Sequence, residues 1–176
     1  MHARTAELLG YLDQQSAVLR AAYDAVPAAS RGLRPAPGRW SPAEVVQHVA
    51  LVERRLTQRI AQLVQQARAL PPERDRSPVL PSVHLARVLD RTRPITASEA
   101  AQPRDADPAR VWGEFEDARA AARELVVSAD GLALGAVSAP HPVLGDLNGY
   151  GWIAFVGAHA ARHAAQIREI AEASAA

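Results

Sequence analysis

The stretch from Trp152 to Ile167 limits most strongly how this chain can fold. Read as an α-helix, it carries an apolar stripe along one face, and that stripe also holds two imidazoles, His159 and His163. Residues four apart are neighbours on a helix face, with Cβ atoms roughly 5–6 Å apart. An apolar stripe of this kind faces a protein interior rather than water. The two histidines are therefore predicted to point into a bundle core, where a third group is needed to explain them.

Three further amphipathic segments predict three more long helices, so the expected fold is an all-α, up-down four-helix bundle. The predicted helices cover residues 3–26, 41–68, 107–130 and 148–173. The second helix has the clearest start, because Ser41 is a good N-cap, Pro42 follows it and Glu44 completes a capping box. That capping role is sufficient to account for Glu44. Asp107 is the predicted cap of the third helix.

The connections between these helices are less regular. Residues 71–106 contain six prolines, among them Pro94, and are predicted to form a long crossover that carries a short helix over 83–91. Residues 132–148 are predicted to be a loop, because no alternating segment there is long enough for a convincing strand. At 176 residues, the chain is expected to form one domain over 1–176.

The composition excludes several kinds of chemistry. The chain has no cysteine, and all 20 of its basic residues are arginines, so disulfides, thiolate nucleophiles and catalytic lysines are excluded. The net charge is only +1 and the arginines are interleaved with acids, so no nucleic-acid partner is expected. The N-terminus lacks a secretory signal, and no apolar run reaches 18 residues. We therefore expect a soluble cytoplasmic protein without a membrane partner.

His48 is the candidate for the third imidazole, because it lies on the apolar stripe of the second helix. If the second and fourth helices are neighbours, His48, His159 and His163 can converge on one point inside the bundle. Three histidines with a fourth position open to water are a ligand set of catalytic zinc sites. The alternative is that all three are core histidines satisfied by hydrogen bonds.

The other histidines are His2, His84 and His141. We interpret them as terminus or loop residues rather than functional ones. His141 is the strongest of these candidates, because its loop leads directly into the helix that carries His159 and His163.

Three segments in order along the chain resemble the DinB/YfiT-like superfamily. They are Trp40–Val49 (WSPAEVVQHV), His141–Gly145 (HPVLG) and His159–Ile167 (HAARHAAQI). The resemblance implies a four-helix bundle, often a homodimer, with a divalent metal ion on His48, His159 and His163. The ion would be nickel, zinc, iron or manganese. The resemblance also implies a small-molecule substrate, and either metal-dependent hydrolysis or a transferase or isomerase reaction that uses an external low-molecular-weight thiol.

Groups that support such a site are less clearly indicated. Gln166 follows His163 by one turn and either orients that ring or bonds across helices. Arg162 is predicted to point away from the stripe, into a salt bridge at the surface or between subunits. Glu53 and Glu114 are both candidates for a general base, and the spacing selects neither.

Three functions remain open at this point. The leading one is a metal-dependent enzyme, because a metal ion with an open position lowers the pKa of bound water or activates a thiol. The second is a non-catalytic metal-binding or stress-response module. A structural zinc normally has four protein ligands, and the sequence offers no obvious fourth, which favours the open, catalytic type. A role in transcription is suggested only by the stress-linked family name, and the charge argues against it.

Overall fold

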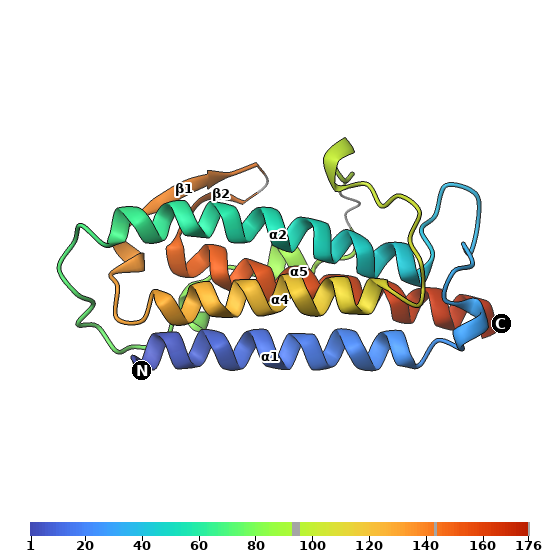
Figure 1. Ribbon diagram of the computed structural model, residues 1–176, viewed down its shortest axis with the longest axis horizontal. Coiled ribbons are helices and arrows are strands. Elements are labelled where there is room, and N and C mark those ends of the chain that lie inside the picture. The colour runs from blue at the N-terminus through green and yellow to red at the C-terminus, as the bar shows by residue number, and fades with distance from the viewer. Residues whose placement is uncertain (93–95, 143, 176) are drawn as a thin grey trace.

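Four long helices lie side by side in the computed structural model, which describes residues 1–92, 96–142 and 144–175 (Figure 1). They are α1 (Ala3–Asp24), α2 (Pro42–Ala67), α4 (Val111–Ser128) and α5 (Gly149–Ala175). The expected four-helix bundle is therefore confirmed. Three residues that belong to predictions lie outside the described residues. They are Pro94 of the predicted crossover, Val143 of the HPVLG motif and Ala176 at the end of the predicted domain. Among the helices described, none is long and apolar enough to cross a membrane.

The helix directions do not alternate strictly. In Figure 1, α1 and α5 run from left to right, whereas α2 and α4 run from right to left. The hydrogen bonds at the two ends agree with this. The Tyr23 hydroxyl near the end of α1 donates to the carbonyl of Pro108 before α4, and the amide of Glu73 after α2 donates to the carbonyl of Gly131 after α4. The bundle therefore pairs α2 and α4 in parallel, with a long connection returning the chain between them.

The helix starts follow local capping. Ser41 and Glu44 form the predicted capping box, with the Ser41 hydroxyl accepting from the Glu44 amide and the Glu44 carboxylate accepting from the Ser41 amide. α4 begins a few residues later than predicted. The Asp107 carboxylate accepts from the amide of Ala109, so it closes a separate turn ahead of the helix, and Arg110 is the residue at the N-cap.

The predicted loop over 132–148 contains a short hairpin, which corrects the all-α expectation. Its strands β1 (Ser138–His141) and β2 (Gly145–Asn148) pair antiparallel, with His141 opposite Gly145. Four residues per strand are too few to produce a readable alternation, and a lone hairpin is marginal in water. This one is held by the bundle, because the Trp152 indole of α5 donates to the carbonyl of Ala139.

The connection between α2 and α4 carries short helical pieces along the bundle. The predicted helix over 83–91 is present as the shorter α3 (Ala86–Leu89). In the described part of the chain, the single-turn 3₁₀ segments are η1 (Ala28–Ser30), η2 (Leu80–Ser82), η3 (Glu99–Ala101) and η4 (Leu134–Ala136). Both α3 and η3 contact the long helices, α3 against α5 and η3 against α2.

The core consists of two apolar clusters, one toward each end of the bundle. Between Ala50 of one cluster and Leu56 of the other lies Glu53, which is 1% exposed. Its carboxylate accepts two hydrogen bonds from the guanidinium of Arg119 on α4, at 2.5 and 2.9 Å. Arg119 also donates to the carbonyl of Leu12 on α1. The candidate base Glu53 is therefore engaged in a buried ion pair that joins three helices.

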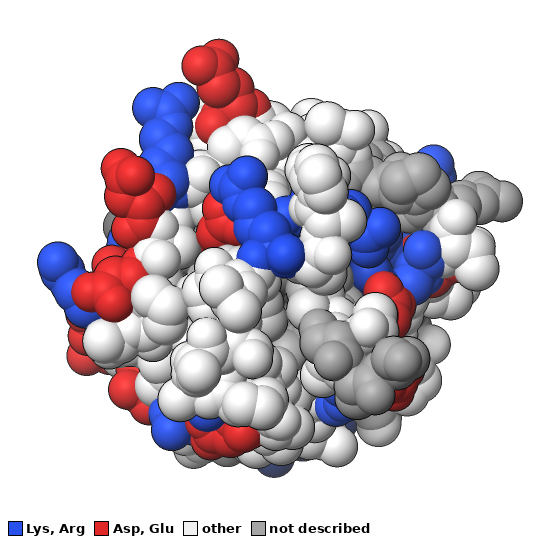
Figure 2. Space-filling view, turned by 90° about the vertical axis from the view of Figure 1, so that its right-hand side faces the viewer, with Lys and Arg blue, Asp and Glu red and all other residues white. Residues whose placement is uncertain are grey.

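The surface charge is mixed. Figure 2 views the end of the bundle that lies on the right in Figure 1, and basic and acidic side chains are interspersed over that face. Among the residues coloured there, neither sign forms a continuous patch.

Candidate metal centre

Three imidazoles from two neighbouring helices meet inside the bundle. α2 supplies His48 and α5 supplies His159 and His163, one turn apart. The ring centroids lie 5.2 Å apart for His48 and His159, 4.8 Å for His48 and His163, and 4.5 Å for His159 and His163. One ring nitrogen of each lies within 4.8 Å of the others. The structure thus brings together the three histidines that the sequence singled out.

A backbone carbonyl fixes the protonation of His48. Its Nδ1 lies 2.7 Å from the carbonyl oxygen of Ala101 in η3. A carbonyl oxygen only accepts, so Nδ1 must carry the proton and donate it. In the neutral ring the Nε2 lone pair is then left for a metal ion.

Gln166 fixes the protonation of His163 in the same way. The His163 Nδ1 donates to the Gln166 Oε1 at 2.8 Å, so of the two predicted alternatives Gln166 takes the orienting role. The Nε2 of His163 lies 3.1 Å from the Nε2 of His159. Two nitrogens bound at 2.0–2.1 Å to a tetrahedral zinc ion would lie roughly 3.3 Å apart. The separation of these two atoms therefore fits two ligands of one ion.

The electrostatic surroundings keep the rings neutral. Burial lowers the pKa of His48, and lowers that of His163 to about 3. Burial, followed by the neighbouring His163 and His48, also holds the pKa of His159 well below its usual value. Neutral imidazole is the form that binds metal ions. The same burial that disfavours protonated rings therefore preserves the ligand form down to mildly acidic pH.

The three ligands differ in exposure. His48 and His163 are 5% and 7% exposed, whereas His159 is partly exposed. Trp40 covers His48, with ring centroids 4.7 Å apart. Among the described residues, the cluster contributes three ligand side chains and no carboxylate. The donor set therefore fits a divalent ion held by imidazole ligands.

The structure corrects the prediction for Arg162. This side chain is buried rather than at the surface, and its guanidinium donates to the carbonyls of Val88, at 2.9 Å, and Asp90. These carbonyls lie at the C-terminal end of α3, so Arg162 holds α3 against α5 beside the two histidines. A helix C-terminus with its unpaired carbonyls is a favourable partner for a cation.

The remaining candidates lie elsewhere. Glu114 is on α4, which supplies none of the three histidines. His2 is the N-cap of α1, where its Nδ1 accepts from the amide of Arg4, and His84 is exposed between η2 and α3. His141 lies on β1 and packs against Trp152 and Phe155, at ring distances of 5.2 and 4.5 Å.

Sequence reasoning missed two groups next to the histidines. The carbonyl of Ala101 leaves no signal in the sequence, because every residue has one and only the fold selects it. Trp40 contacts His48 and lies directly before the N-cap of the helix that carries it, and this position was the available clue.

Comparisons with known proteins identify the family and the fold of this chain. A family model described as the DinB superfamily matches residues 11–167. A crystal structure of TT2238, described as a four-helix bundle protein, is similar with a TM-score of 0.57 at 24% identity, over 94% of this chain and 95% of that one. Among curated proteins, none matches this chain. The structural likeness supports the fold alone.

Proposed function

The chain belongs to the DinB superfamily, and from this premise we propose that it is a divalent-metal-binding protein with His48, His159 and His163 as its ligands. The observation that carries the proposal is the convergence of the three rings. In two of them the Nδ1 atom already donates a hydrogen bond, from His48 to the Ala101 carbonyl and from His163 to the Gln166 side chain. Partners of this kind fix ring orientation at metal sites. The ion would be zinc, nickel, iron or manganese, and imidazole suits the first three best.

We further propose that the protein is a metal-dependent enzyme that acts on a small molecule. A metal ion with an open position lowers the pKa of a water or thiol that binds there. Water would lead to hydrolysis, and an external low-molecular-weight thiol to an S-transferase or isomerase reaction. The three histidines would hold the ion. Ala101 and Gln166 would orient the rings of His48 and His163, and the burial of these two rings would keep water away from them. The alternative is a non-catalytic metal-binding or stress-response module.

Metal analysis of untagged protein tests the binding. We expect about one equivalent of divalent metal in the wild type and less than a tenth of that in His48→Ala. His84→Ala is the matched control, because His84 is exposed, and it should keep the wild-type content. Less than a tenth of an equivalent in the wild type, with His48→Ala unchanged in metal content and melting temperature, would reject the proposal.

Turnover separates the two enzyme classes from the alternative. The metal-loaded protein would be assayed on a panel of activated esters, amides and electrophiles, with and without added thiol. Hydrolysis requires no thiol, whereas transfer shows turnover proportional to thiol at low concentration. For an enzyme of either class, we expect chelation to abolish turnover while the fold is retained. A non-catalytic module gives turnover equal to that of His48→Ala on every substrate.

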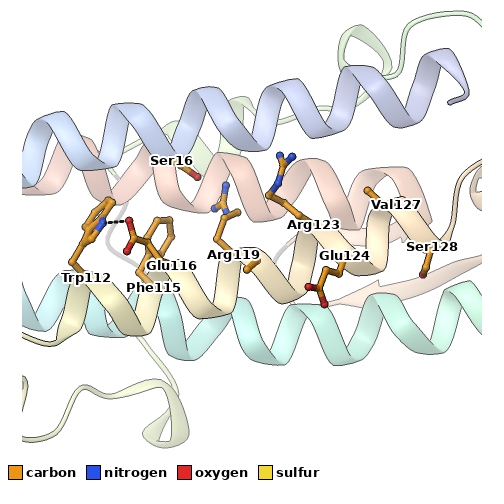
Figure 3. A pocket seen from close by; sticks show the side chains of 10 residues that line it. Ser16, Trp112, Phe115, Glu116, Arg119, Arg123, Glu124, Val127 and Ser128 are labelled. Carbon is orange, nitrogen blue, oxygen red and sulfur yellow. Dashed lines mark hydrogen bonds between the residues drawn. The ribbon is translucent and has the colours of Figure 1, made fainter.

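We also propose a homodimer, for which the surface between α1 and α4 is the best candidate. α1 packs chiefly on α5 and α2 chiefly on α4, and a groove of 620 Å³ lies along α4 beside α1. Figure 3 shows Trp112, Phe115 and Val127 along this groove, and Val127 is 48% exposed. A two-fold dimer would place the same apolar surface on both partners. Sedimentation should show a dimer that Val127→Arg dissociates and that Gln58→Arg, on the exposed face of α2, leaves intact.

A further inference from the structure

The chain contains a single asparagine, Asn148, and a glycine follows it. In an Asn–Gly pair the amide nitrogen of the glycine can attack the side-chain amide carbon of the asparagine, because glycine has no side chain to obstruct the approach. Asn148 is the last residue of β2 and is exposed, and Gly149 is the first residue of α5. The reactive pair therefore stands where the hairpin meets the helix that carries His159 and His163.

Packing requires a glycine at position 149. A Cβ atom there would lie 2.9 Å from the Cβ of Leu134 in η4 and 3.0 Å from the carbonyl oxygen of the same residue. Real Cβ contacts are longer, and a backbone oxygen cannot turn aside as the end of a flexible side chain can. The fold therefore cannot remove the reactive pair by placing a larger residue after Asn148.

Both reacting groups are held by hydrogen bonds in the folded protein. The Gly149 amide donates to the carbonyl of Val137, just before β1, at 3.0 Å. The Asn148 side-chain oxygen accepts from the amide of Gly151 at 2.8 Å, which caps the start of α5. Ring closure requires the Gly149 nitrogen to lose its proton and to approach the side chain of Asn148. Both hydrogen bonds must therefore open before the reaction.

The indole of Trp152 holds the same junction closed. Its Nε1 donates to the carbonyl of Ala139, which pairs with Leu147 across the hairpin. Trp152 is 4% exposed, so little water competes for this hydrogen bond. Separation of the hairpin from the start of α5 has to break it as well.

We propose that Asn148 is a deamidation site, and that local opening of the junction between β2 and α5 limits its reaction. The Gly149 nitrogen forms a bond to Cγ of Asn148, the Cγ–Nδ2 bond breaks, and ammonia leaves with the proton that the nitrogen has lost. Water then opens the cyclic imide at either of its carbonyls, which gives aspartate or isoaspartate. Deamidation is slow compared with local opening, so its rate follows the open population. The inference is independent of the proposed metal site.

The two products have different consequences for the fold. Aspartate caps a helix as well as asparagine does, and its charge is favourable at a helix N-terminus. Isoaspartate instead lengthens the backbone by one carbon, which moves the Gly149 amide away from the carbonyl of Val137. We therefore expect Asn148→Asp to keep the wild-type melting temperature, and the isoaspartate form, separated from aged protein by ion exchange, to melt lower.

The rate would be measured by peptide mapping with mass spectrometry, as the gain in mass at Asn148 during incubation in mildly alkaline buffer. We expect the folded wild type to react at least about tenfold more slowly than the same chain unfolded in guanidinium chloride. Trp152→Phe should react about three- to tenfold faster than the folded wild type, the value of one lost hydrogen bond. Trp112→Phe loses an indole donor on α4 and is the matched control, with the wild-type rate expected.

Gly157→Ala separates local opening from a general loss of stability, because it crowds Tyr11 of α1 and leaves the contacts of the hairpin in place. It should keep a rate close to that of the wild type. A rise as large as that of Trp152→Phe would assign the reaction to unfolding of the whole protein and overturn the inference.

Other results would overturn it as well. Equal rates in the folded and the unfolded chain would mean that the junction does not limit the reaction, and no reaction in the unfolded chain would mean that Asn148 is not a deamidation site. A Trp152→Phe rate equal to that of Trp112→Phe would place the opening elsewhere. An isoaspartate form that melts together with Asn148→Asp would contradict the contacts from which the junction is inferred.

Discussion

At the scale of single residues, Gly157 sets how closely α1 approaches α5. A Cβ atom at this position would lie 2.5 Å from a ring carbon of Tyr11 on α1. Real Cβ contacts are longer, so Gly157→Ala must displace the Tyr11 ring or separate the helices. We expect a loss of about 1–3 kcal/mol in the free energy of unfolding, as for overpacking elsewhere, measured by urea denaturation.

Gly151 provides the control on the same helix. A Cβ there would meet Leu147 and Asn148 at 3.4 Å, which is close to ordinary contact. Gly151→Ala should therefore be neutral or gain up to about 1 kcal/mol from helix propensity. Equal effects of the two substitutions would show that Gly157 is not a packing requirement.

The histidine cluster shows what single-residue patterns can predict. Helical periodicity alone placed His48, His159 and His163 on inward faces, because a 3.6-residue repeat fixes the direction of a side chain once the helix is correct. The same reasoning failed for Arg162. Arg162 does point to a different face of α5 from the histidines, as predicted. That face is covered by α3, and no pattern in the sequence indicated that α3 would pack there.

At the scale of elements, the buried pair of Glu53 and Arg119 joins α2 to α4, and Arg119 also bonds to α1. Removing one partner leaves the other charge buried without compensation. We expect Arg119→Met to cost about 3–5 kcal/mol of unfolding free energy, and Glu53→Leu combined with Arg119→Met to recover most of that loss. Denaturant titrations of the single and double variants provide the measurement.

A double variant as unstable as Arg119→Met would contradict this expectation. It would mean that the hydrogen bond to the Leu12 carbonyl, rather than the uncompensated carboxylate, accounts for the loss. The arrangement also explains why Glu53 could not be assigned from sequence. Its partner lies 66 positions away, on a helix whose parallel pairing with α2 was not foreseen.

The connection between α2 and α4 is attached to the candidate metal site through η3. Its Ala101 carbonyl accepts from the His48 Nδ1, and a metal ion on Nε2 would make that N–H a stronger donor. Chelation should therefore loosen η3. We expect amide exchange at Ala101 and Gln102 to become about three- to tenfold faster in metal-free protein, as measured by hydrogen–deuterium exchange.

The 3₁₀ turn η1 serves as the internal reference for this experiment. It has the same type of hydrogen bonds as η3 but lies in the loop between α1 and α2. Its exchange should not respond to the metal. A uniform rise in exchange over both turns would instead indicate that chelation destabilises the whole protein.

At the scale of the whole molecule, the histidines are expected to govern stability in mildly acidic solution. Burial lowers the pKa of His48, His159 and His163, and of His141 as well, and the value for His163 is about 3. In the unfolded chain a histidine titrates near 6.5. Above that pH the histidines are neutral in both states, so they do not lower the free energy of unfolding. Below it the histidines of the unfolded chain bind protons while the buried rings of the folded state stay neutral, so stability falls as the pH decreases.

We therefore expect metal-free protein to lose unfolding free energy from pH 6.5 downward, at up to about 1.4 kcal/mol per pH unit for each buried histidine. Carboxylates with lowered pKa, such as Glu73 and Glu169, add to the loss only at lower pH, near their own unfolded values. Urea titrations at a series of pH values, with excess chelator, measure the slope. His163→Gln should reduce the slope, because it removes one ring that stays neutral in the folded state, whereas His84→Gln, at an exposed position, should not. A flat profile between pH 6.5 and about 4.5 would mean that the folded state accepts protons at the cluster, in conflict with the neutral rings that a metal ion requires.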